Sequence, residues 1–286
     1  MALAVPASTP HTFVFADLAG WTALTEAHGD ADAVRIITEF EIRVRELLPQ
    51  HHAEEVKSIG DAVMIRVDEP LDAIKLGLDI SERLSAPRAP PVRIGMSTGP
   101  AVSRNGDWFG RTVNLASRVA AAARPGEVLL TETTRQALTE LDGLQLQPRG
   151  KRRLRNLADP VAIYRAVDPS HRALTLDIDP VCRMAVDPRD PAATRRRWGV
   201  TRYFCSLECA TAFDDRPRRY VATSPAARAA RTGFVINLGA FLAVGLAHLA
   251  LWLRRGRPGG RSPLRAVFAV WAAALVIHFR LVRRAL

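Results

Sequence analysis

The chain has 286 residues and a formal net charge of +11, and 48% of its residues are hydrophobic. This length allows two folded domains with additional segments, and the apolar content excludes wholesale disorder. The charge alone would suggest nucleic acid, but 13 arginines and no acidic residue stand between Arg216 and Leu286. The first 215 residues carry 27 basic and 29 acidic side chains. Nucleic acid is therefore not expected as a partner, and the basic charge belongs to an apolar tail.

Residues 9–168 alternate strand-like and helix-like patterns, which predicts a single α+β domain. A strand is expected at 12–16, and a hairpin at 54–67 turns at Gly60-Asp61. Helices are expected at 31–48, 71–84, from Gly110 to Ala123 and at 131–141, and further strands at 92–103, 128–130 and 161–166. This order favours a mainly antiparallel sheet with helices on one face.

Two acidic residues of this domain stand at predicted strand ends. Asp17 closes the apolar strand Phe13-Val-Phe-Ala-Asp17, and Asp61 lies in the hairpin turn of Lys57-Ser-Ile-Gly-Asp61. Two carboxylates at adjacent strand ends are suited to hold Mg²⁺, which prefers oxygen ligands. Alternatively, Asp17 caps the following segment and Asp61 only makes a turn.

Asn114 and Arg118 are four residues apart, so a helix would place them on one face. An amide and a guanidinium that project together suit a ligand with hydroxyl groups and phosphate charge. The alternative is a solvated helix face that carries a surface arginine.

The motifs F-x-D-x-x-G-x-T, K-x-x-G-D, R-x-G-x-x-x-G and D-x-x-G-x-x-V-N-x-A-S-R occur in this order, before the closing segment Leu154 to Tyr164. Together they make residues 9–168 resemble the class III nucleotidyl cyclases. The resemblance implies a ferredoxin-like catalytic domain that works as a head-to-tail homodimer with its sites at the interface. It also implies ATP as substrate and two Mg²⁺ or Mn²⁺ ions per site as cofactors.

Carried over residue by residue, the resemblance assigns a role to each motif position. Asp17, Asp61 and the Leu18 carbonyl would hold the two metal ions, Lys57 and Asp107 would read adenine, Asn114 would orient the ribose, Arg118 would stabilise the transition state, and Arg155 and Arg93 would bind phosphate. Arg155 stands where the family often has a lysine. A guanine-reading cyclase usually has other residues at the positions of Lys57 and Asp107.

All three cysteines, Cys182, Cys205 and Cys209, lie in residues 179–220. An odd, clustered set does not indicate a disulfide framework, so a reducing compartment and metal ligation are expected. Three thiolates suit Zn²⁺ or another soft metal and leave room for a further ligand, whereas the alternative is three small buried residues. The segment resembles the YHS domain, although Arg183 replaces the usual glycine after the first cysteine.

The remaining residues form a connector at 221–232 and two apolar runs. Gly233–Leu253 is 21 residues long without a charge, which predicts a membrane-spanning helix, and 264–282 predicts a second span flanked by arginines. A buried helix of a soluble domain is the alternative for the first run. If only this run spans, the C-terminus lies outside the cell.

The resulting hypothesis is a membrane-anchored adenylate cyclase whose catalytic and cysteine regions face the cytosol. The cysteine module would regulate it through metal or redox state, and the tail arginines would meet anionic lipid. Two alternatives stay open: an inactive metal-responsive sensor that keeps the cyclase fold for dimerisation, and a guanylate cyclase.

Overall fold

The computed structural model describes residues 9–170, 175–197, 199–220, 225–255 and 271–276. The chain divides into two compact units. One comprises Met1–Thr194 with Tyr203–Asp215, and the other comprises Arg195–Arg202 with Arg216–Leu286. The cysteine-bearing residues 179–194 and 203–215 thus belong to the same unit as the strands that precede them.

The first unit is built on a seven-stranded sheet of order β2-β3-β1-β4-β7-β9-β8. Its strands are β1 (His11–Leu18), β2 (Ala53–Ile59), β3 (Ala62–Val67), β4 (Val92–Gly99), β7 (Val128–Thr131), β8 (Gln145–Arg152) and β9 (Val161–Val167). Only β4 and β7 are parallel among these paired strands, which confirms a mainly antiparallel sheet. Chain order β1-α1-β2-β3-α2-β4 with spatial order β4-β1-β3-β2 is the ferredoxin-like arrangement.

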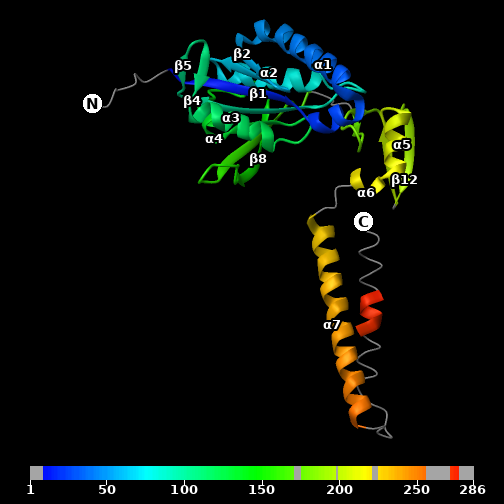
Figure 1. Cartoon of the computed structure of the whole chain (residues 1–286). Coiled ribbons are helices and arrows are strands. Elements are labelled where there is room, and N and C mark those ends of the chain that lie inside the picture. The colour runs from blue at the N-terminus through cyan, green and yellow to red at the C-terminus, as the bar shows by residue number, and fades with distance from the viewer. Residues whose placement is uncertain (1–8, 171–174, 198, 221–224, 256–270, 277–286) are drawn as a thin grey trace. The chain divides into compact units, whose positions relative to one another are not determined.

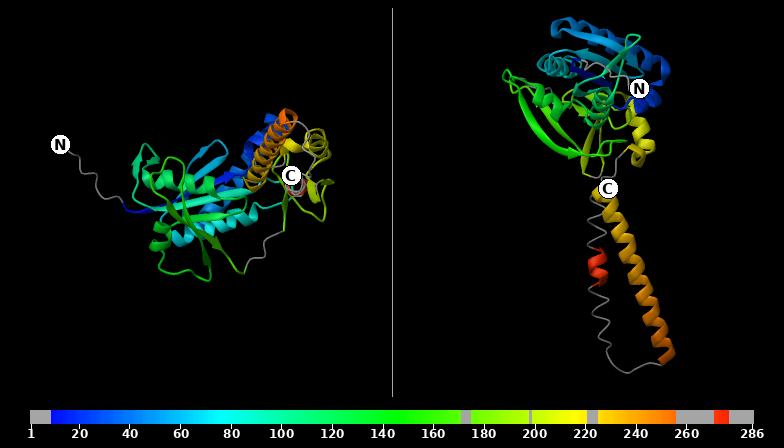
Figure 2. Two further views of the ribbon diagram at one scale, coloured as in Figure 1. Left: turned by 90° about the horizontal axis from the view of Figure 1, so that it is seen from below. Right: turned by 90° about the vertical axis from the view of Figure 1, so that its left-hand side faces the viewer.

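Helices cover both faces of this sheet (Figures 1 and 2). They are α1 (Trp21–Leu47), α2 (Pro70–Arg83), α3 (Arg111–Ala122) and the short α4 (Glu132–Ala137). Residues of β1 alternate between the faces: Val14 and Ala16 pack in the same cluster as α1 and α2, whereas Phe13 and Phe15 pack with α3. The prediction of helices on one face was therefore wrong, because both faces of β1 are apolar and each needs a cover.

The predicted hairpin at 54–67 is confirmed by β2 and β3, with Gly60 in the left-handed region at φ 61°. The predicted strands at 92–103 are confirmed as β4 and β5 (Val102–Arg104), and β5 pairs with β6 (Asp107–Phe109). Two elements differ from expectation. Helix α1 begins ten residues earlier, at Trp21, and the sequence pattern did not predict β8, which pairs with β9 in an extended hairpin (Figure 2).

Short elements follow the sheet: β10 (Asp177–Ile178), β11 (Ala185–Val186), β12 (Ala193–Arg197), β13 (Val200–Phe204), α5 (Leu207–Asp215) and α6 (Pro217–Tyr220). Strands β10 and β11 pair, and β12 pairs with β13. Phe204 and Phe213 are fully buried and lie with ring centroids 5.3 Å apart. A few large apolar side chains thus form the core of a segment that has little regular structure.

The second unit contains the long helix α7 (Pro225–Arg255), which includes the uncharged run Gly233–Leu253. In the portion of the chain that the structure describes, no helix meets the length and hydrophobicity needed to cross a bilayer, so the predicted spans are not confirmed. Most of the second predicted span, 264–282, lies outside the described residues. Its described part packs on α7, with the rings of Phe241 and Trp271 5.5 Å apart.

Candidate active site

The two predicted carboxylates meet at the end of β1. Asp17 is opposite Ala62 of β3 and Arg93 of β4, and Asp61 occupies the turn between β2 and β3. The Leu18 N–H donates to the Asp61 carbonyl at 3.1 Å, which fixes this turn against the strand end. The structure therefore brings together Asp17, Leu18, Asp61 and Arg93, which sequence reasoning assigned to metal and phosphate.

This cluster has two carboxylates, those of Asp17 and Asp61, and one guanidinium, that of Arg93, so negative charge is in excess. Burial raises the pKa of Asp17 to about 6; the ion pair with Arg93 opposes this shift and the neighbouring Asp61 adds to it. The Arg93 Nε is buried and, among the described residues, has no hydrogen-bond partner. Two adjacent carboxylates that a single arginine does not fully neutralise fit the oxygen-ligand chemistry of Mg²⁺ or Mn²⁺.

A second cluster joins β2 to the β5–β6 hairpin. The Lys57 Nζ donates to Asp107 Oδ2 at 2.5 Å and lies 5.7 Å from the Phe109 ring centroid. This hydrogen bond, together with one from the Trp108 N–H, lowers the pKa of Asp107. The pair holds one donor and one acceptor side by side.

Both clusters lie on one face of the sheet. Lys57 is opposite Met64, and Met64 is opposite Phe15, so the Lys57 side chain shares its face with Phe15 and, two residues along β1, with Asp17. Helix α3 covers this face. The register of β1, β2 and β3 therefore places residues of two motifs on one face, and the hydrogen bond from Lys57 adds Asp107 of a third.

Helix α3 supplies Asn114, which is exposed, and Arg118, which is half-buried. It starts after Gly110, whose φ of 142° suits glycine, and it packs very closely on β4. A Cβ added to Gly95 would lie 1.9 Å from the Ala120 backbone nitrogen. Glycine at this position of β4 therefore sets the distance between α3 and the sheet.

Arg155 lies next to Leu154, which packs with Val119 of α3, the helix that covers this face. It is exposed in the turn between β8 and β9, beside Asn156 at φ 61°. Strand β8 forms the sheet edge opposite β2, which carries Lys57. The phosphate-binding role of Arg155 stays a prediction.

The three cysteines also converge. The Cys182 and Cys205 sulfurs are 3.3 Å apart, and those of Cys205 and Cys209 are 3.8 Å apart. Hydrogen bonds from Cys182 and Cys205 lower the pKa of Cys209, which favours its thiolate. His28 of α1 completes the group, with its Nε2 4.0 Å from the Cys205 sulfur. Sequence reasoning missed His28, because it lies in another region and no spacing links it to the cysteines.

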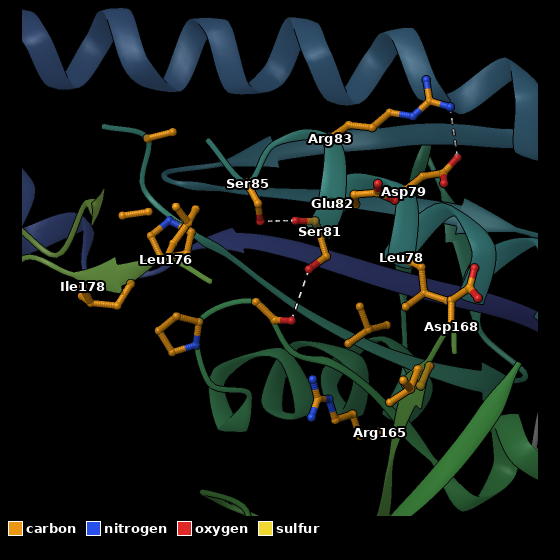
Figure 3. Close-up of a pocket in the computed structure, with 18 residues that line it drawn as sticks. Leu78, Asp79, Ser81, Glu82, Arg83, Ser85, Arg165, Asp168, Leu176 and Ile178 are labelled. Atoms are coloured by element: carbon orange, nitrogen blue, oxygen red, sulfur yellow. Dashed lines mark hydrogen bonds and ion pairs between the residues drawn. The ribbon is translucent and has the colours of Figure 1, made fainter. Parts of the chain in front are cut away.

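A cavity of about 520 Å³ lies elsewhere on this unit, between α2, β7, β9 and the segment around Ile178 (Figure 3). The Ser81 hydroxyl, which lines this cavity, donates to the Gly126 carbonyl at 3.2 Å, and Figure 3 shows the ion pair of Arg83 with Asp79. Its lining residues include none of the predicted site residues. This cavity is therefore separate from both clusters.

Comparisons with known proteins identify a family that the chain matches. Residues 4–165 match the family described as the adenylate and guanylate cyclase catalytic domain. The chain is 37% identical over 165 residues to a pH-sensitive adenylate cyclase of Mycobacterium tuberculosis, covering 56% of this chain and 41% of that protein. It is 35% identical over 117 residues to an adenylate cyclase of Streptomyces griseus, covering 41% of this chain and 29% of the relative.

The fold is shared with solved structures. An adenylate cyclase of Trypanosoma brucei in its monomeric state matches with a TM-score of 0.52 at 24% identity, over 63% of this chain and 96% of that chain. The chain spans less than half the length of the curated relatives described above.

Proposed function

Because the chain belongs to the adenylate and guanylate cyclase catalytic domain family, we propose that it is an adenylate cyclase that converts ATP into 3′,5′-cyclic AMP and pyrophosphate. The observation that carries this proposal is the Lys57–Asp107 pair at 2.5 Å, on the sheet face that also carries Asp17. An ammonium donor beside a carboxylate acceptor complements the N1 acceptor and amino donor of adenine. Guanine presents the reverse pattern.

We propose that Asp17, Asp61 and the Leu18 carbonyl hold two Mg²⁺ or Mn²⁺ ions. The raised pKa of Asp17 and the adjacent Asp61 support this assignment, because a divalent cation would relieve their mutual repulsion. When bound, such ions supply Lewis-acid stabilisation of the developing phosphoryl charge.

The chain's own side chains would do the remaining work. Lys57 and Asp107 would bind the base, Asn114 would orient the ribose, and Arg118 would stabilise negative charge on the transferring phosphoryl group. The ribose 3′-oxygen then forms a bond to the α-phosphorus and releases its proton to water, and the bond from the α-phosphorus to the bridging oxygen of the β-phosphate breaks to release pyrophosphate. We propose that a homodimer forms two such sites.

The test uses the purified full chain in detergent with Mn²⁺ and either ATP or GTP, followed by identification of the product. We expect cyclic AMP from ATP, and a loss of at least about 100-fold in kcat for Asp17→Ala or Asp61→Ala. Asp142→Ala, which removes a carboxylate paired with Lys75 on the exposed surface, is the matched control. Cyclic GMP as the main product would make the chain a guanylate cyclase, and no cyclic product would favour a non-catalytic sensor.

We propose that the tail anchors the enzyme in the cytoplasmic membrane as a helical hairpin, with the catalytic region in the cytosol, where ATP is found. Exposed apolar side chains on α7 support this proposal: Val235, Ile236, Leu242 and Leu246 are 54–67% exposed to solvent. The packing of Trp271 on Phe241 also supports a hairpin. Recovery of the chain in the soluble fraction after cell lysis without detergent would contradict it.

We also propose that residues 179–220 form a YHS-type module that responds to a soft metal. The convergence of Cys182, Cys205 and Cys209 supports this role, because three thiolates within bonding reach of one point favour such an ion.

A further inference from the structure

Four potential metal ligands converge in the first unit, three from the cysteine segment and one from α1. The ligand atoms of His28, Cys182, Cys205 and Cys209 all lie within 4.8 Å of one another. The three cysteines are buried, and His28 is half-buried. The thiols are free, since the 3.3 Å between Cys182 and Cys205 is far longer than a disulfide bond of about 2.05 Å.

The spacing fits a tetrahedral ion. Zn–S bonds of about 2.3 Å at tetrahedral angles place neighbouring sulfurs about 3.8 Å apart. The observed sulfur–sulfur distances are 3.8 Å between Cys205 and Cys209 and 3.3 Å between Cys182 and Cys205, and the imidazole Nε2 of His28 lies 4.0 Å from the Cys205 sulfur, so the distances bracket the expected value. Three thiolates and one imidazole are a ligand set typical of closed, structural zinc sites.

The surroundings hold the ligands in place before any ion binds. Asp179 is fully buried, and its carboxylate accepts hydrogen bonds from the backbone N–H groups of Cys205 at 2.8 Å and Cys182 at 3.4 Å. The Ser206 hydroxyl accepts one from the Cys209 N–H at 3.1 Å. Each cysteine backbone is therefore fixed by a neighbouring side chain, as expected of supporting groups around a metal.

We propose that His28, Cys182, Cys205 and Cys209 form one Cys₃His site for Zn²⁺, in which a histidine of the catalytic fold completes the ligand set of the cysteine module. The inference rests on the proposed metal role of that module and adds His28 to it. It makes the ion a link between two regions of the chain that are far apart in sequence.

The helical segment that ends at His28 connects the proposed zinc site to the strand that carries Asp17. Gly29 breaks the helical geometry of α1 immediately after His28, at φ 81° and ψ 170°. The ligand therefore ends a short helical segment that starts at Trp21, three residues after Leu18. Zinc binding would fix the far end of this segment, whose near end follows the strand with the Asp17 carboxylate.

The cysteine segment also contacts two other parts of the first unit, at Gly20 and at Arg88-Ala89. The Arg183 side chain lies against Gly20, where an added Cβ would come within 2.4 Å of the Arg183 Cβ. The backbone of Ala185 exchanges hydrogen bonds with Arg88 and Ala89 at 2.7 and 2.9 Å. The cysteine segment therefore contacts the turn before α1 and the segment after α2, in addition to His28.

The test measures metal content and ligand identity in the purified full chain, kept reduced. We expect about one Zn²⁺ per chain, and a Co²⁺-substituted protein with the visible spectrum of a tetrahedral site with three sulfur ligands. His28→Gln should weaken zinc binding by about 100-fold or more, since loss of even an outer-shell partner costs about 10–100-fold. His52→Gln, which removes an exposed imidazole paired with Asp72, is the matched control and should leave binding unchanged.

A second variant tests the role of His28 directly. His28→Cys should restore tight binding and shift the Co²⁺ spectrum to that of a four-thiolate site. If wild-type protein holds metal that Cys205→Ser removes, but His28→Gln and His28→Cys both leave the affinity and spectrum of the wild type, His28 is not a ligand. If folded wild-type protein binds no metal at all, both this inference and the proposed metal role of the module are wrong.

Discussion

At the scale of single residues, Asp17 is a carboxylate whose charge destabilises the metal-free protein. Burial and the neighbouring Asp61 raise its pKa from 3.8 to about 6, despite the ion pair with Arg93. Between these pH values the folded state holds the proton more tightly than the unfolded state. The stability of the fold therefore decreases as the pH rises through this window, by up to about 3 kcal/mol in total.

We expect Asp17→Asn to raise the free energy of unfolding of chelator-treated protein by about 1–3 kcal/mol near neutral pH, although the variant should be inactive. The gain should largely vanish near pH 4, where the Asp17 carboxyl of the folded wild-type protein is protonated and carries no charge. Urea unfolding at both pH values measures it, with Asp142→Asn as the exposed control. A less stable variant near neutral pH would show that the lost pairing with Arg93 outweighs the cost of burial.

Lys57 offers a second test at this scale. A hydrogen bond to a charged group contributes about 1.5–3 kcal/mol, so Lys57→Met should reduce the preference for ATP over GTP in kcat/KM by about 10–100-fold. The matched control is Lys75→Met, because Lys75 makes a similar pair with Asp142 at 2.6 Å on the surface. Competition assays with both nucleotides measure the ratio, and an unchanged ratio would remove Lys57 from base recognition.

At the scale of elements, apolar periodicity predicted the helices and strands that pack a buried face. The pattern missed β8 because Gln145–Arg152 is an edge strand with mostly exposed polar residues and no clear alternation. It placed the start of α1 after Gly29-Asp30, because these residues read as a break, whereas the structure keeps them as a kink inside the helix. His28 had no signal at all, since only tertiary packing joins α1 to the cysteines.

The close packing of α3 on β4 is an element-scale feature with a direct test. Gly95→Ala would place a methyl group within 1.9 Å of the Ala120 nitrogen, so α3 must move away from the sheet with Asn114 and Arg118. We expect a loss of stability of about 1–3 kcal/mol and a fall in kcat larger than the change in KM.

Gly239→Ala in α7 is the control for this change, since its added Cβ meets nothing within 4 Å. Thermal unfolding and steady-state kinetics of both variants give the comparison. Normal kcat in a folded Gly95→Ala protein would mean that the position of α3 does not limit the reaction.

At the scale of the whole molecule, the basic charge is concentrated in the proposed membrane segment, and the proposed catalytic region is nearly neutral. The 13 arginines after Asp215 accompany the uncharged run of α7, whereas the first 215 residues are nearly neutral. Arginines beside an apolar helix are suited to anionic lipid headgroups. A nearly neutral catalytic region leaves recognition of the nucleotide to a few placed side chains rather than to a general positive field.

The proposed homodimer makes a prediction about whole molecules. If each site combines the Asp17 cluster of one chain with Arg118 of the other, two inactive variants should complement each other. In a mixture of Asp17→Ala and Arg118→Ala, half of the randomly assorted dimers are mixed, and each mixed dimer has one intact site. We therefore expect about a quarter of wild-type activity after co-expression.

The control pair is Asp17→Ala with Asp61→Ala. Asp17 and Asp61 belong to one cluster. This pair could complement only if the two carboxylates of a site came from different chains. Because the two carboxylates lie at one strand end of the same chain, every site built on either variant lacks one of them, and this pair should stay inactive. If Asp17→Ala and Arg118→Ala also fail to complement in dimers verified as mixed, each site is built within a single chain.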